Sequence, residues 1–101
     1  MPYYNMKDYV HDGFQRSHLK HKKYNAILIH KKTKRITRVP FGAVKVNGAP
    51  YEQYKDSTGL KLFSKYDHYD KKRRSNYKSR HNGFIKPGYY SPGYFAMRYL
   101  W

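Results

Sequence analysis

The sequence predicts a small α+β fold, in which a β-hairpin or three-stranded sheet is followed by two short C-terminal helices. Three observations lead to this prediction: two β-prone runs around a basic turn, a polar run that suits a helix, and a Ser-Pro helix start near the end of the chain. With 101 residues, the chain holds one domain at most. We expect an extended arm at residues 1–22 and an α+β domain at residues 23–101.

The predicted arm is polar and aromatic, and its rings follow no regular period. Tyr3, Tyr4, Tyr9 and Phe14 fall at irregular spacings. A segment without apolar periodicity has no obvious face to bury. We therefore expect residues 1–22 to be extended and to become ordered only on contact with a partner.

The hairpin has the clearest strand signal. Residues 24–30 are β-prone, residues 31–34 form a basic turn, and residues 35–39 return with apolar positions between polar ones. Because proline has no amide donor, Pro40 either ends the return strand or lies at a sheet edge. Residues 41–46 are the candidate third strand.

Two helices are predicted in the C-terminal half, beyond a loop in which residues 59–66 are a candidate short helix. Residues 69–81 contain neither proline nor glycine, and Asp70 is a suitable N-terminal cap. The last helix begins where Ser91 precedes proline and covers residues 93–101. At about nine residues it needs packing partners, because short isolated helices are unstable in water.

Charge is the strongest functional signal. Lys and Arg number 22 against 6 Asp and Glu, a formal net charge of +16, and residues 13–51 contain ten basic residues and no acidic one. Such a stretch repels itself unless a polyanion neutralises it, and nucleic acid is the commonest polyanion. A purely solvated surface and an anionic membrane surface are the alternatives. The candidate nucleic-acid-binding residues are Lys31, Lys32, Lys34, Arg35, Arg38, Lys71, Lys72, Arg73, Lys78 and Arg80.

Tyrosine is the second unusual feature. The chain has 13 Tyr, whereas Leu, Ile, Val and Phe together number 18. Few aliphatic residues with high charge are typical of disorder, but each tyrosine adds a large ring and a hydroxyl. The C-terminal rings exceed what a small core can bury, so we expect several to meet another chain. The candidate protein-interface residues are Tyr89, Tyr90, Tyr94, Phe95, Tyr99 and Trp101.

Several functional classes are disfavoured. The chain has no cysteine, and its longest apolar run, residues 26–29, is too short for a membrane span. The N-terminal residues lack the apolar core of a signal peptide. Nothing in the sequence forces the histidines to converge on a metal. His68, Asp70, Arg80 and His81 could form a nuclease-like group, but Asp70 suits a helix cap better. We therefore expect no enzyme activity, cofactor, metal or small-molecule substrate.

Five motifs carry a resemblance to a known family. They are Phe41-Gly42, the stretch from residue 51 to 56 (YEQYKD), the stretch from residue 68 to 81 (HYDKKRRSNYKSRH), Pro92-Gly93-Tyr94-Phe95 and Leu100-Trp101. This pattern resembles a family of small basic proteins encoded by large double-stranded DNA viruses of algae and protists, over residues 24–101. The resemblance implies a viral origin and a role in the virion or with the genome. The N-terminal arm and the Pro-Gly-Tyr repeat depart from the family pattern.

The predicted function combines these observations. We expect a non-enzymatic viral structural protein, in the minor capsid or the virion interior, that bridges protein neighbours through its aromatic rings. Its basic residues would contact nucleic acid, with DNA bound independently of sequence, or an acidic surface. The alternative is a free DNA- or RNA-binding protein that compacts or regulates nucleic acid in the infected cell. The expected location is the virion, and the host cytoplasm or nucleus during assembly.

Overall fold

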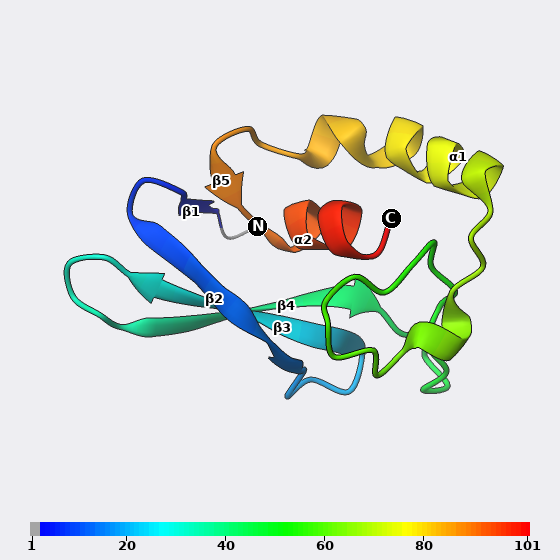
Figure 1. Cartoon of the computed structure of the whole chain (residues 1–101), viewed down its shortest axis with the longest axis horizontal. Helices are drawn as coiled ribbons and strands as arrows, with labels where there is room; N and C mark the ends of the chain where they lie inside the picture. The colour runs from blue at the N-terminus through cyan, green and yellow to red at the C-terminus, as the bar shows by residue number, and fades with distance from the viewer. Residues whose placement is uncertain (1–2) are drawn as a thin grey trace.

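The computed structural model describes residues 3–101 and has an α+β architecture, which confirms the predicted fold class (Figure 1). One antiparallel sheet has the order β2-β3-β4, and a second pairs β1 with β5. The elements are β1 (Tyr4–Asn5), β2 (Tyr9–Arg16), β3 (Lys22–His30), β4 (Ile36–Ala43), the 3-10 helix η1 (Ser64–Tyr66), α1 (Lys71–His81), the 3-10 helix η2 (Asn82–Phe84), β5 (Tyr89–Tyr90) and α2 (Pro92–Tyr99).

The predicted hairpin is present as β3 and β4. Its register places Ala26 opposite Val39 and Ile29 opposite Ile36. Pro40 lies within β4 opposite Asn25, and β4 is an edge strand of its sheet. The sheet-edge alternative for this proline is therefore the correct one, because an edge strand leaves one side of the backbone without ladder partners.

The third strand is β2, which differs from the prediction. Residues 9–16 pair with the free edge of β3, so much of the expected arm belongs to the sheet. Residues 41–43 merely continue β4, and Val44 makes only an isolated bridge to Pro50. The strand β2 was not predicted because it contains a β-bulge between His11 and Phe14, where Gly13 has φ +101°. A bulge interrupts the period of two and hides the strand pattern in the sequence.

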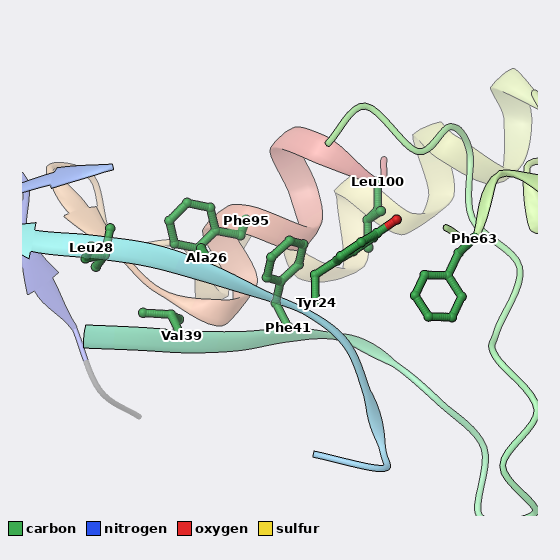
Figure 2. Close-up of a cluster of buried hydrophobic side chains, with 8 residues drawn as sticks. All are labelled: Tyr24, Ala26, Leu28, Val39, Phe41, Phe63, Phe95 and Leu100. Atoms are coloured by element: carbon green, nitrogen blue, oxygen red, sulfur yellow. The ribbon is translucent and has the colours of Figure 1, made fainter. Parts of the chain in front are cut away.

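The core lies between the three-stranded sheet and α2 (Figure 2). From the sheet, β3 supplies Tyr24, Ala26 and Leu28, and β4 supplies Val39 and Phe41, all at most 1% exposed. The other members of this cluster are Phe63, Phe95 and Leu100. Alternate residues of a strand share one face, so this face of the sheet is apolar and needs a cover. The cover is the C-terminal helix.

The start of α2 agrees with the prediction. The hydroxyl of Ser91 accepts a hydrogen bond from the amide of Tyr94 at 3.2 Å, and Pro92 is the first helical residue. Phe95 is fully buried against the sheet. The short helix is thus stabilised by packing on the hairpin within the same chain.

The predicted cap of α1 is present, although the helix begins at Lys71 and not at residue 69. Asp70 accepts hydrogen bonds from the amides of Lys72 and Arg73. No residue of α1 is buried, and the helix lies on the far side of α2 from the sheet (Figure 1). The candidate helix at 59–66 is reduced to the single turn η1. Lys61 has φ +56°, which is incompatible with a right-handed helix.

Candidate nucleic-acid interface

The hairpin turn, residues 31–35, is exposed and basic. Its backbone is ordered by His30, whose Nδ1 accepts from the amides of Lys32 and Thr33 at 3.2 Å each. Arg38 lies further along β4 and donates from Nε to Oε1 of Gln15 at 2.8 Å. Four of the predicted residues are exposed in this turn: Lys31, Lys32, Lys34 and Arg35.

The outer surface of α1 is the second basic region. The helix contains no acidic residue, and only Asp70, the cap, precedes it with a negative charge. Lys78 is half-buried. The other four predicted residues of the helix are exposed: Lys71, Lys72, Arg73 and Arg80.

The structure does not bring the two basic regions together. The hairpin turn projects at one end of the molecule, whereas α1 begins near the other (Figure 1). The longest dimension of the chain is 40 Å. A ligand that contacts both regions would have to span most of the molecule.

Internal contacts engage most of the acidic side chains. Asp67 accepts from the side-chain amide of Gln53 and from the backbone of Asp56, each at 2.9 Å. Among residues 3–101 the one ion pair joins Arg73 to Glu52 at 3.5 Å, between two largely exposed side chains. Exposed pairs of this kind contribute little. The Lys and Arg surface therefore remains essentially uncompensated.

A cleft of about 750 Å³ opens between the start of β3, the end of β4, α1, and α2 together with the two residues that follow it. We call it the basic cleft. Its volume suits a small organic ligand. Its charged and aromatic lining includes Lys22, Lys45, Tyr51, Arg73, Tyr77 and Arg80.

One wall of the basic cleft is made by α1, which is held by a ring stack. Tyr77 stacks on Trp101 with centroids 4.1 Å apart and planes 5° apart, and it also stacks on His81 at 4.2 Å. Arg74 donates from Nε to the main-chain oxygen of Trp101 at 2.6 Å and lies over the ring of Tyr54. Burial raises the pKa of Tyr77, so this phenol stays neutral at physiological pH.

Lys23 lies at the inner end of the cleft and was not foreseen from the sequence. Its side chain is 2% exposed, and its ammonium donates to the main-chain oxygen of Tyr51 at 2.6 Å and to Oε1 of Gln53 at 2.7 Å. Burial lowers the pKa of Lys23 to about 8, against the attraction of Asp56 and Asp67. The ammonium fixes the backbone beside the cleft and adds positive charge to it.

A buried polar network continues from Lys23 into the loop at residues 51–67. The hydroxyl of Tyr24 donates to Asp56, and the amide of Leu62 donates to that hydroxyl at 3.0 Å. Burial and the hydrogen bond to Asp56 raise the pKa of Tyr24 to about 12. Gln53 donates to the main-chain oxygen of Phe63 at 2.9 Å. The sequence offers a single sign that Asp56 has a structural role, which is that the chain has few acidic residues.

The rings predicted to meet another protein pack largely within this chain. Phe95 is fully buried and therefore faces no partner in this fold. Tyr90 stacks on Phe95 at 5.6 Å, Tyr94 meets both of these rings edge-on, and Tyr99 also packs against Phe95. The excess of C-terminal rings is thus largely explained by an aromatic core.

The two remaining candidates, Tyr89 and Trp101, are half-buried. Tyr89 has the ammonium of Lys86 4.6 Å from its ring centre. Trp101 stacks on Tyr77 and lines the basic cleft. Trp101 therefore lies in the same cleft as the basic residues Arg73 and Arg80.

The histidines do not gather into a ligand set. His11 packs against the rings of Phe14 and Phe95 at 4.7 and 5.0 Å. Burial lowers the pKa of His11. Within the described part of the chain, no three His, Asp or Glu side chains lie close enough to hold a metal ion. None of the helices described is long and apolar enough to pass through a bilayer.

Comparison with family models, curated proteins and solved structures gives no match to this chain. The surface of the molecule is therefore the only basis for a proposed function.

Proposed function

We propose that this chain is a non-enzymatic nucleic-acid-binding protein that contacts phosphates through Lys and Arg. One observation carries the proposal. The structure engages Asp56, Asp67 and Asp70 in internal hydrogen bonds. Among residues 3–101, Arg73 is the only exposed basic side chain that forms an ion pair, and its partner is Glu52. Most of the net charge of +16 is therefore carried by the surface of the molecule. Such a surface attracts a polyanion over a long range.

The distribution of charge on α1 favours binding independent of sequence. Lys71 and Lys72 are exposed and stand at the capped beginning of the helix. Ammonium groups on flexible stems act as point charges toward phosphates, whereas base reading needs fixed bidentate donors. The affinity should therefore come from counterion release and depend strongly on salt.

The separation of α1 from the hairpin turn favours a bridging role. Two basic regions at opposite ends of a molecule 40 Å long can contact two segments of nucleic acid at once. Bridging of this kind compacts a long polyanion. We propose compaction as the outcome of binding, with the hairpin turn and α1 as the two contacts.

Salt-dependent binding tests the proposal. Anisotropy of a labelled duplex, titrated with protein from 50 to 300 mM KCl, should show affinity falling by orders of magnitude. The variant Lys71→Gln/Lys72→Gln should reduce the log–log slope by about 2, because each phosphate contact contributes about 0.9. The matched control is Lys7→Gln/Lys55→Gln, which removes two exposed charges outside both basic regions.

Three outcomes are distinguishable. A reduced slope for the α1 variant alone supports binding through α1. Equal reductions in both variants would show diffuse charge and contradict the assignment to α1. An affinity that stays flat from low to high salt would contradict nucleic-acid binding altogether.

We further propose that the bound nucleic acid is a viral genome and that the protein is packaged in the virion. This part of the proposal rests on the resemblance of residues 24–101 to viral proteins. Mass spectrometry of purified, salt-washed particles should detect the chain. Its recovery only from the lysate of infected cells would contradict packaging and favour a free nucleic-acid-binding protein.

A further inference from the structure

The basic cleft differs from the rest of the charged surface because aromatic rings line it. Tyr51 is 49% exposed, yet its backbone is held at both ends: its amide donates to Ala43, and its carbonyl oxygen accepts from Lys23 at 2.6 Å. The ammonium of Lys45 lies 5.5 Å from the centre of the Tyr51 ring. An exposed ring on an anchored backbone, flanked by a cation, is a ready stacking surface.

Further basic side chains line the same cleft as this ring. Arg73 and Arg80 enter the cleft from α1, and Lys22 enters from the beginning of β3. Glu52 is the single acidic residue in the lining, and it is paired with Arg73. The lining therefore combines a planar apolar surface with several phosphate-binding groups.

A second hollow continues the cleft along the side of α1. It has a volume of about 530 Å³ and shares Arg73, Arg80 and Trp101 with the cleft, and Asn76 and Ser79 complete its lining. The two hollows together form a channel along which successive phosphates could follow the basic side of the helix. A channel of this kind suits a chain of linked nucleotides.

Resting on the proposed nucleic-acid binding, we propose that the basic cleft binds an unpaired nucleotide of a single strand. The base lies against Tyr51, and the phosphates contact Lys45, Arg73 and Arg80. A duplex is excluded from the cleft because its bases are paired and stacked inside the helix. It contacts only the exposed basic residues outside the cleft, on α1 and on the hairpin turn. Proteins that bind single strands combine basic grooves and stacking rings in the same way.

The test compares three ligands of equal nucleotide concentration: a 20-nucleotide oligo(dT), a 20-base-pair duplex, and free dTMP. Trp101 is the only tryptophan and lines the cleft, so its fluorescence reports an occupant directly. We expect the single strand to change the Trp101 emission and the duplex to bind without changing it. Free dTMP matching the oligonucleotide in affinity would overturn the assignment to a strand.

Substitution of Tyr51 separates stacking from charge. Tyr51→Leu should weaken binding of oligo(dT) by about 5-fold or more, since stacking on one ring contributes about 1–3 kcal/mol, and should leave duplex binding unchanged. Tyr51→Phe keeps the ring and should retain the affinity. Tyr69→Leu is the matched control, because Tyr69 is 58% exposed and does not line the cleft.

The outcomes separate this inference from the proposed function. Salt-dependent binding of both nucleic acids with equal strength, unaffected by Tyr51→Leu, would overturn the cleft assignment and leave phosphate binding intact. Failure of both nucleic acids to bind would overturn the two proposals together. A circular-dichroism melt of Tyr51→Leu shows whether a loss of binding comes from unfolding.

Discussion

The buried ammonium of Lys23 provides a quantitative test of the electrostatics of this fold. Its pKa is lowered from 10.5 to about 8 by burial, although Asp56 and Asp67 favour the charged form. The substitution Lys23→Met keeps a long apolar stem and removes the ionisable group. Comparing the two proteins over a range of pH isolates the free energy of burying this one charge.

The direction of the effect follows from proton binding. Between pH 8 and 10.5 the unfolded chain binds a proton at Lys23 that the folded protein has already lost, so stability rises with pH. Each unit of pKa difference corresponds to about 1.4 kcal/mol, and from pH 7 to pH 10 the expected gain is about 2–3 kcal/mol. Above pH 10 the opposite effect begins, because the pKa of Tyr24 is raised to about 12 in the folded protein.

The assay is urea unfolding followed by Trp101 fluorescence at pH 7, 8, 9 and 10. The difference in free energy of unfolding between wild type and Lys23→Met should increase by about 2–3 kcal/mol over this range. Lys20→Met removes the same charge from an exposed position, so its difference from wild type should change by less than about 0.5 kcal/mol. Parallel pH profiles for wild type and Lys23→Met would refute the argument that burial of Lys23 controls its ionisation.

Four further substitutions test the core, the backbone at two glycines and the cap of α1. Phe95→Ala should lower the free energy of unfolding by about 3–5 kcal/mol in urea titrations, because this fully buried ring joins α2 to the sheet. Gly42→Ala should be destabilising by more than about 1 kcal/mol, since φ is +84° and the new Cβ would lie 2.9 Å from Cβ of Lys23. The control Gly83→Ala should not be destabilising, because its new Cβ would have no atom within 4 Å. Asp70→Ala should cost about 1 kcal/mol and reduce the helical circular-dichroism signal of α1.

Local signals explain which elements could be predicted from the sequence. The hairpin and both helices begin or end at residues whose chemistry determines the backbone nearby, such as the caps Asp70 and Ser91. The strand β2 was missed because the bulge at Gly13 removes the alternation that identifies a strand. The loop at residues 51–67 has no local pattern either. Its conformation depends on hydrogen bonds to residues more than 25 positions away, such as that between Tyr24 and Asp56.

Part of the candidate site could likewise be predicted from the sequence, and part could not. Runs of charge in the sequence were sufficient to identify the exposed residues of α1 and of the hairpin turn. Lys and Arg are rarely buried without a partner, so most residues of a dense basic run are exposed. The basic cleft could not be predicted, since Lys23, Tyr51 and Tyr77 come from three separate parts of the chain. Rings are ambiguous for a further reason. Tyr51 and Phe95 are both aromatic, and only the fold shows that one is exposed and the other buried.

The excess of tyrosine and the excess of positive charge are connected in this structure. A buried tyrosine needs a partner for its hydroxyl, and Tyr24 in the core finds one in the carboxylate of Asp56. Asp56 is then buried at 3% exposure, and Asp67 is drawn inward to accept from its backbone amide. Of the chain's six acidic residues, Asp56 is thereby removed from the surface, and Asp67 is half-buried. Replacing Tyr24 by phenylalanine would remove one of the two hydroxyl donors of the buried Asp56 and leave that of Thr58, so the tyrosine hydroxyl helps to keep this acidic group away from the basic exterior.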